Sequence, residues 1–237
     1  MRRLLKKLVL SGNESNRRDD SSTIEKRISN IRNIWNNEHQ DDVGIEKILR
    51  LFLAVSQFFF PGLYIKHYFG KQSEGLKDLM MDLYILLKVF FPLSLLAYQW
   101  APYEYVSIPL IWLFTETMLY VPTLIFASDL FPRPSSYRRS MLLVFVNYFE
   151  IVFVYAFIYA NGNYLNAPFT NWYDPIYFSF TTLSTIGFGD YYPVTGPGKF
   201  LVCTQSLVFL SFVVLFLNFF SSKAEQKGYF QAKSHDE

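Results

Sequence analysis

The sequence predicts an all-α membrane protein with four transmembrane helices, a short re-entrant helix that leads into an extended segment, and an N-terminal helix at the membrane interface. Half of the 237 residues are apolar, and they come in long blocks that carry almost no charge. Blocks of about 20 such residues match the ~30 Å hydrocarbon core of a bilayer. Lysine and arginine are absent between Lys88 and Arg133 and between Arg139 and Lys199. The polar turns in those two intervals are therefore assigned to the outer side.

Residues 1–45 are expected to form a cytoplasmic N-terminal region, because they are rich in charged side chains and turn-forming residues. The basic residues among them favour contact with anionic lipid headgroups over contact with nucleic acid. Four isoleucines at helical spacing predict a short amphipathic helix on the membrane surface or on a partner. They are Ile24, Ile28, Ile31 and Ile34.

Residues 46–66 are expected to form an interfacial or membrane-embedded helix. The apolar run is short, contains Ser56 and Gln57, and ends at Pro61 and Gly62, which favours a bent, cuff-like helix at the interface. If the segment crossed the bilayer instead, the basic N-terminus would lie outside, against the usual bias of basic residues. The interfacial placement is preferred on that ground, and a crossing is the alternative.

Four stronger apolar stretches follow, each long enough to cross a bilayer: residues 79–99, 106–129, 140–160 and 199–221. Basic residues flank the predicted cytoplasmic ends, with Lys77 before the first stretch and three arginines from Arg133 to Arg139 between the second and third. Four crossings return the chain to its starting side. Both termini, including a short tail at residues 222–237, are therefore predicted to be cytoplasmic in a multi-pass protein of the cell membrane.

Residues 173–184 predict a half-helix that enters the membrane without crossing it. Asp174 followed by Pro175 is a helix-start signal, and only about ten residues separate it from a glycine-containing run. This run, Thr185 to Asp190 (TIGFGD), is called the filter segment below. Extended backbone at membrane depth is tolerated where it lines a water-filled path, and its carbonyl oxygens can replace the hydration shell of a cation. The two glycines allow the dihedrals that point successive carbonyls the same way.

The filter segment and its flanks resemble the signature of potassium-channel pores of the single-pore tetrameric type. The resemblance covers residues 140–221, in the order outer helix, pore helix, filter and inner helix. It implies a potassium-selective ion channel subunit that conducts K+ passively through a homotetrameric pore. K+ would be bound by the backbone carbonyls of four residues, with Gly189 completing the ion-binding filter. The four are Thr185, Ile186, Gly187 and Phe188.

The same resemblance implies supporting roles for Thr181, Ser184 and Asp190 around the filter segment. The side chains of Ile186 and Phe188 are expected to point away from the ion path, into the packing behind it. Phenylalanine at position 188 stands where tyrosine is commoner, so a hydroxyl that could brace the filter from behind is missing.

Three other functions compete with this interpretation. Potassium uptake subunits resemble four pore repeats in one longer chain, whereas this chain carries one. A poorly selective cation channel is disfavoured by the Gly-Phe-Gly run. A non-conducting subunit that regulates another channel is disfavoured by the intact filter segment.

Residues 79–130 are expected to supply two transmembrane helices of unknown role that are not a standard voltage sensor. A voltage-sensing helix carries arginine or lysine at regular intervals, and the stretch 106–129 contains no basic residue. Weak or absent voltage sensing is therefore predicted, and the regulator is unknown.

Three charged residues fall near the middle of apolar spans and are expected to form an intramembrane charge network: Lys88, Glu116 and Glu150. A charge at that depth is costly unless it is paired or neutral. The first two spans run antiparallel, which puts Lys88 and Glu116 at similar depth. Two roles are open for the network, namely a salt bridge that fixes helix packing or a coupling or proton-sensing site.

No enzyme, cofactor or protein-bound metal centre is expected. The sequence shows no nucleophile with a base and no phosphate-binding loop, and His39, His67 and His235 are scattered in or beside polar stretches. Cys203 is the single cysteine, so no intrachain disulfide can form. The expected partners are identical subunits and membrane lipids, and K+ is the permeant ion.

The inner helix is expected to line the pore without a glycine hinge. No glycine occurs from Phe200 to Gln226, although related channels often bend at a glycine midway along this helix. The resemblance to potassium-channel pores, carried along the helix by helical spacing, implies that Leu210, Val213 and Leu217 face the pore, where a ring of apolar side chains could stop ions by dewetting.

Truncating the predicted ring tests this assignment. Leu217→Ala should raise the basal current, because a wider and less apolar constriction stays wet. The measurement is steady-state potassium current of the variant against the wild type, and an unaltered current would count against a gate at this position.

Overall fold

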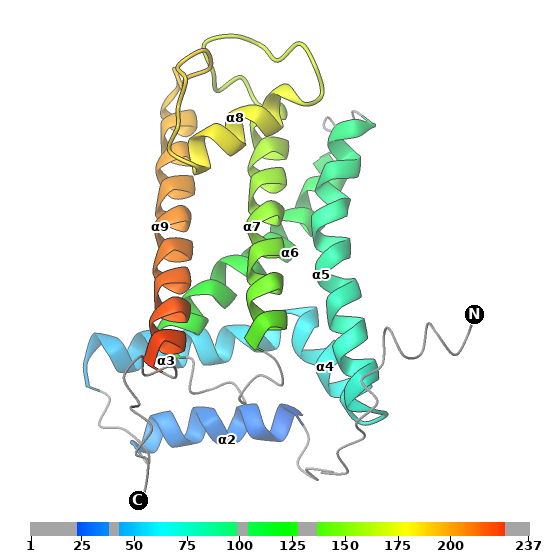
Figure 1. The fold of residues 1–237 in the computed structure, drawn as a ribbon, viewed down its shortest axis with the longest axis vertical. Helices are drawn as coiled ribbons and strands as arrows, with labels where there is room; N and C mark the ends of the chain where they lie inside the picture. The colour runs from blue at the N-terminus through cyan, green and yellow to red at the C-terminus, as the bar shows by residue number, and fades with distance from the viewer. Residues whose placement is uncertain (1–22, 38–42, 99–103, 128–136, 226–237) are drawn as a thin grey trace, which may run out of the picture.

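The computed structural model describes residues 23–37, 43–98, 104–127 and 137–225, and over those residues it is helical without a β-strand (Figure 1). The basic start of the chain, His39, His235 and the tail from residue 226 lie outside this description. The helices are α2 (Thr23–Asn36), α3 (Ile45–Ser56), α4 (Pro61–Gly70), α5 (Glu74–Ala97), α6 (Glu104–Phe126), α7 (Tyr137–Ala160), α8 (Asp174–Leu183) and α9 (Gly196–Glu225), with a 3-10 turn η1 (Gln57–Phe59) after α3.

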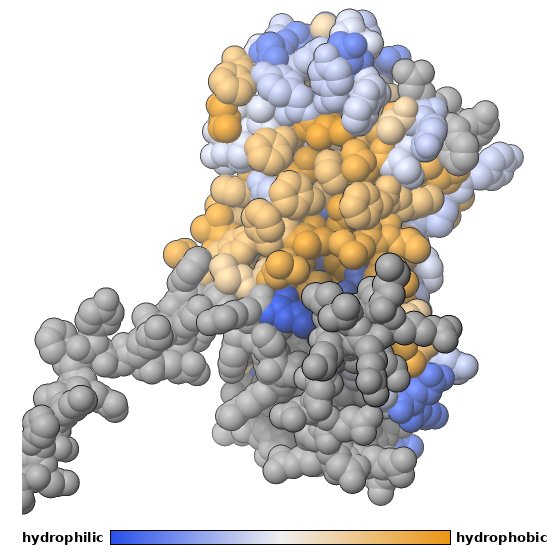
Figure 2. All heavy atoms as spheres, turned by 45° about the vertical axis from the view of Figure 1, so that its right-hand side comes forward, coloured by the Kyte–Doolittle hydropathy of each residue, from blue (hydrophilic) through white to orange (hydrophobic). Residues whose placement is uncertain are grey.

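Helices α5, α6, α7 and α9 are each long and apolar enough to cross a membrane, which confirms the predicted fold class. A band of hydrophobic residues runs across the middle of the molecule, and hydrophilic residues gather at the end that carries the loops around α8 (Figure 2). The protein is therefore a multi-pass membrane protein. All four spans start a few residues earlier than predicted, and polar caps precede two of them, α5 and α9. The Ser73 hydroxyl accepts the Leu76 N–H at 3.1 Å before α5, and the Thr195 hydroxyl accepts the Gly198 N–H at 3.2 Å before α9.

Helix α7 lies at the centre of the packing. It contacts α5, α6, α8 and α9, and its middle turns are almost fully enclosed. Helices α5, α7 and α9 stand side by side in Figure 1, α6 crosses obliquely behind them, and α8 bridges α7 and α9 near the end of the molecule opposite to α2. The core residues with no more than 1 % exposure on α7 are Ile151, Val152, Val154, Ala156, Phe157 and Tyr159.

The predicted bent helix at residues 46–66 is a pair of helices. Helix α3 with η1 meets α4 at an angle of 68°. Phe60 is extended at the junction and Pro61 starts α4, as expected because proline disfavours a helical conformation in the residue before it. Helix α3 lies across the lower ends of the spans (Figure 1). It exposes an apolar stripe of the kind that an interfacial helix presents to lipid. The stripe consists of Ile45, Ile48, Phe52, Val55 and Phe59.

Candidate functional site

The first turn of α8 is fixed by the carboxylate of Asp174. One of its oxygens, Oδ2, accepts the N–H groups of Thr170 and Asn171 and the Thr170 hydroxyl, each at 2.9 Å. The Tyr191 hydroxyl, beyond the filter segment, approaches the same oxygen at 3.4 Å. A negative charge in the first helical turn is also favoured by the helix dipole. The predicted helix start at Asp174 and Pro175 thus ties the preceding loop to the half-helix.

The other end of α8 holds the filter segment. The Thr181 carbonyl accepts the N–H groups of Ile186 and Gly187 at 2.9 and 3.2 Å, and the Thr182 carbonyl accepts that of Thr185 at 3.1 Å. The last carbonyls of a helix have no partner inside it, so the filter backbone satisfies them and is satisfied in return. Ser184, the third predicted support beside Thr181 and Asp190, donates its hydroxyl to the Phe180 carbonyl at 2.7 Å.

The backbone of the filter segment alternates between two conformations. Thr185, Gly187 and Gly189 have positive φ values of 58°, 51° and 83°, and the residues between them do not. Glycine is favoured at two of these positions because it adopts positive φ without strain. Lack of room for a side chain is not the reason, since a Cβ atom there would meet nothing within 4 Å in this chain. A positive φ at β-branched Thr185 is an unusual strain, of about 1–2 kcal/mol, that the sequence alone did not predict.

The side chains of the filter segment are exposed in a single chain. The aromatic ring of Phe188 stacks on Tyr177 of α8, with centroids 6.2 Å apart and planes inclined by 7°. Ile186 is exposed, so the expected packing of this side chain behind the filter is not provided by its own chain.

The loop between α7 and α8 is hydrogen-bonded to the end of the filter segment through Asn166. Its Nδ2 donates to the Asp190 carbonyl at 3.0 Å, and its Oδ1 accepts the Tyr192 N–H at 2.8 Å. Its own N–H donates to the Tyr192 carbonyl at 3.0 Å. Sequence analysis missed Asn166, because an asparagine in a polar loop carries no signal of a distant partner.

A buried polar cluster supports α8 from behind. Gln205 of α9, Ser179 of α8 and Tyr159 of α7 are each 0 % exposed and are joined by hydrogen bonds of 2.9 Å. Sequence analysis missed this cluster as well. The available signal was a glutamine inside an apolar span, which is unfavourable without partners.

The exposed face of α9 differs by one position from the predicted pore-facing side. In the single chain Leu210 and Leu217 are exposed, Val214 is exposed between them, and Val213 is more covered, so the pore-facing assignment of the three predicted residues stays a prediction. The alternating spacing of three and four residues along the exposed face selects position 214. The face consists of Phe200, Cys203, Leu207, Leu210, Val214 and Leu217.

The predicted intramembrane charges lie in contact. Lys88 Nζ is 3.2 Å from Glu150 Oε1 and 3.7 Å from Glu116 Oε2. Thr117 accepts from Lys88 and donates to Glu150 at 2.9 Å, which joins α5, α6 and α7 in one cluster. One lysine faces two carboxylates, so the negative charge of Glu116, the more distant of the two, needs further hydrogen-bond donors.

Those donors come from α5 and from the bent pair. The Tyr84 hydroxyl donates to Glu116 Oε2, and the Gly62 N–H in the first turn of α4 donates to Oε1 at 3.2 Å. A Cβ atom at Gly62 would collide with that carboxylate oxygen. The glycine that marked the end of an apolar run is therefore the point at which the α3–α4 bend touches the membrane charge cluster.

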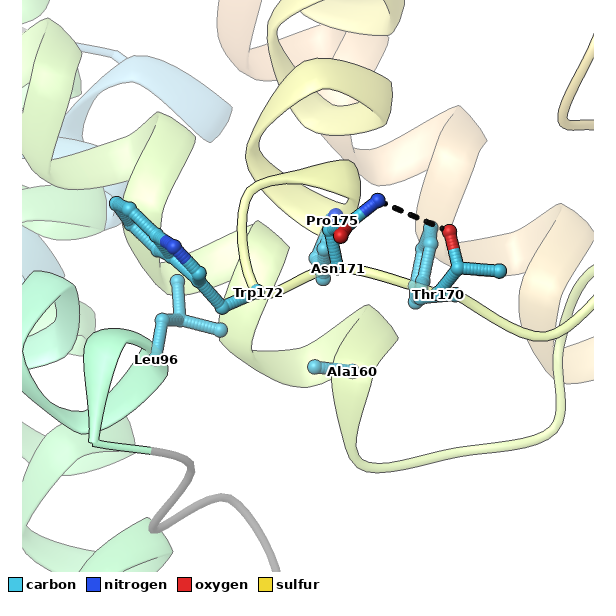
Figure 3. A pocket seen from close by; sticks show the side chains of 7 residues that line it. Leu96, Ala160, Thr170, Asn171, Trp172 and Pro175 are labelled. Atoms are coloured by element: carbon cyan, nitrogen blue, oxygen red, sulfur yellow. Dashed lines mark hydrogen bonds between the residues drawn. The ribbon is translucent and has the colours of Figure 1, made fainter.

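An apolar hollow of about 150 Å³ lies at the C-terminal ends of α5 and α7, behind the start of α8 (Figure 3). Leu96, Ala160 and Trp172 line it, together with Thr170 and Asn171, whose side chains are hydrogen-bonded to each other at 3.1 Å. The filter segment does not line it. Within the described residues there is also no group of three or more potential metal-ligating side chains.

Comparison with protein families matches residues 141–226 to a family described as ion channel. The match begins in α7 and takes in α8, the filter segment and α9, and it leaves α2 to α6 outside. No curated protein and no solved structure matches the chain. The C-terminal part of this membrane protein is therefore an ion-channel domain.

The contact between Gly62 and Glu116 predicts a stability difference between two glycines of α4. Gly62→Ala should destabilise the protein by about 1–3 kcal/mol, because it displaces the half-buried Glu116 carboxylate from its donor. Gly70→Ala is the matched control, since a Cβ there meets only the flexible end of Lys77 at 3.5 Å. Thermal unfolding in detergent measures both. Equal effects of the two substitutions would contradict the contact.

The environment of Asp174 predicts an acid-sensitive filter support. Burial acts to raise the pKa of its carboxyl, but hydrogen bonds from Asn171 and Thr170 outweigh burial and lower the pKa below its ordinary value. The ionised form therefore stabilises the folded state above about pH 4, and this contribution is lost as the pH falls through the lowered pKa.

Asp174→Asn should cost about 1–2 kcal/mol at neutral pH and should remove part of the stability loss in acid. Thermal unfolding between about pH 3 and 7 measures this, with Glu46→Gln, an exposed acid of α3, as the control for lost charge. Parallel acid profiles of Asp174→Asn and wild type would refute the assignment.

Proposed function

We propose that the chain is one subunit of a potassium-selective channel that conducts K+ passively across the cell membrane through a homotetrameric pore. The observation that carries the proposal is the filter segment itself, whose backbone alternates in φ directly after a half-helix that cannot cross the bilayer. Alternation of this kind turns successive carbonyls toward one side, as dehydration of a cation requires.

Potassium selectivity is supported by the way the carbonyls are held. In this proposal, K+ binds the carbonyls of Thr185, Ile186, Gly187 and Phe188, and Gly189 completes the filter. Their position depends on the hydrogen bonds to Thr181 and Thr182 at one end and to Asn166 at the other. The carbonyl end of α8 carries the negative pole of the helix dipole and favours a cation nearby.

Assembly with identical subunits is supported by what one chain leaves exposed. One chain supplies one filter segment, whose six residues all lie at the surface. Of the four spans, α9 is the least enclosed, with 11 % of its apolar window buried. Four copies arranged around an axis would bring filter segments and exposed α9 faces together, and K+ would then be surrounded by enough oxygens.

The proposed orientation puts the filter segment outside and α2 and α3 on the cytoplasmic side, with both termini there. Residues 46–66 rest at the interface in this arrangement, as the exposed stripe of α3 favours. Leu210 and Leu217 would line the cavity below the filter. Transport, not catalysis, is the proposed activity, and K+ is the permeant ion.

Flux through the purified chain tests the proposal. Liposomes that contain only this protein should show potassium flux that barium blocks, and no sodium flux, because the carbonyl sites fit a dehydrated K+. Equal sodium and potassium flux would refute selectivity.

Gly187→Ser is the filter control, since a side chain at a position with φ of 51° is strained. The variant should lose selective flux in any condition that activates the wild type. Selective flux that survives this substitution would refute the assignment of the filter segment.

A further inference from the structure

The amide of Gln205 is fully paired inside the protein. It lies in the apolar span of α9 with no exposed surface. Its Oε1 accepts the Tyr159 hydroxyl at 2.9 Å, and its Nε2 donates to both the carbonyl and the hydroxyl of Ser179 at 2.9 Å. A buried amide without partners is costly, so these three hydrogen bonds hold Gln205 in one place.

The chemistry of the partners sets the direction of every hydrogen bond in the cluster. The Ser179 carbonyl can only accept, so Nε2 faces it and Oε1 faces Tyr159, whose hydroxyl must donate. The Ser179 hydroxyl accepts from Nε2 and donates its own hydrogen to the Val152 carbonyl of α7 at 2.7 Å. The inner helix, the half-helix and the outer helix are thereby joined at one point.

Ser179, where the three helices are joined, is close to the Thr181 carbonyl that supports the filter segment. Ser179 precedes Thr181 by two residues on the same helix, and the Thr181 carbonyl accepts the N–H groups of Ile186 and Gly187. A displacement of α8 at Ser179 would therefore also move the Thr181 carbonyl, which accepts the hydrogen bonds of the filter backbone. Asp174 fixes the outer start of α8, and Gln205 fixes its middle against α9.

We propose that Gln205 is a positioning residue for ion selectivity, which holds α8 against α9 so that the carbonyls of the filter segment keep their spacing. The proposal rests on the potassium-channel function proposed above. Gln205 touches no ion in this mechanism and acts through Ser179 and the α8 backbone.

A role in packing alone would give a different result. The ring of Tyr159 also packs edge-on against Phe178, with centroids 4.8 Å apart, and this contact does not need the amide of Gln205. Loss of packing would lower thermal stability and leave the permeability ratio unchanged. The ratio of sodium to potassium permeability therefore distinguishes a positioning residue from a packing residue.

The experiment compares Gln205→Leu with Thr204→Val in liposomes of the full-length chain. Thr204 is the neighbouring residue, and its hydroxyl accepts the Tyr155 hydroxyl of α7 at 3.1 Å, so it joins α9 to α7 and not to α8. Gln205→Leu should raise the sodium-to-potassium permeability ratio about tenfold or more, as expected when the support loses a net hydrogen bond. Thr204→Val should leave the ratio within about twofold of wild type.

Each outcome decides the proposal. A selective wild type with an unchanged ratio in Gln205→Leu overturns the role of Gln205 and leaves the proposed function intact. Equal changes in both variants also overturn it, because a general loosening of α9 would then be the cause. A wild type that passes sodium as well as potassium overturns the proposed function and this inference together.

Milder variants cover the case in which Gln205→Leu does not fold. Tyr159→Phe and Ser179→Ala each remove one hydroxyl from the cluster, and each should raise the ratio by a smaller factor. Where Gln205→Leu folds, the double variant with Tyr159→Phe should be no worse than Gln205→Leu alone, because the Tyr159 hydroxyl acts through its hydrogen bond to Gln205. Unchanged ratios in both hydroxyl variants would overturn the proposal.

Discussion

Backbone that is neither helix nor sheet must find partners at membrane depth, and this constraint organises the whole ion-channel domain. The Thr181 carbonyl accepts hydrogen bonds from the N–H groups of Ile186 and Gly187, so the end of α8 holds the backbone of the filter segment. The other polar contacts place α8 and the outer end of that segment. Asp174 fixes the start of α8, and Gln205 fixes the middle of α8 at Ser179. Asn166 binds the Asp190 carbonyl at the end of the filter segment.

The helices outside the family match are joined to this domain by charges. Arg139 of α7 pairs with Asp82 of α5 at 2.6 Å in the N-terminal parts of both helices, and Lys88 pairs with Glu150 near the middle of the two spans. Helix α5 is therefore joined to α7 at two depths. An arrangement of this kind favours joint movement of α5 and α7, in contrast to a sensor helix that slides past its neighbours.

The spans, the half-helix and the filter glycines could be predicted because length, apolar composition and φ preference are local properties of the chain. The meeting of Lys88, Glu116 and Glu150 could be anticipated because charges at membrane depth need partners. Gln205, Asn166 and Gly62 could not be assigned, since their partners lie on other elements. Val213 and Val214 show a related limit, because spacing gives the period of a helix face but not its phase, and in the single chain Val214 is the more exposed of the two.

The exposed face of α9 contains the only thiol of the chain. Cys203 lies on it, one turn before Leu207 and in line with Leu210 and Leu217. Because the 237 residues hold no second cysteine, a thiol-directed label would attach at one known site without any background substitution. The protein thus has a native attachment point for a fluorophore or spin label on the helix proposed to line the pore, from which distances between subunits could be measured in the unmodified sequence.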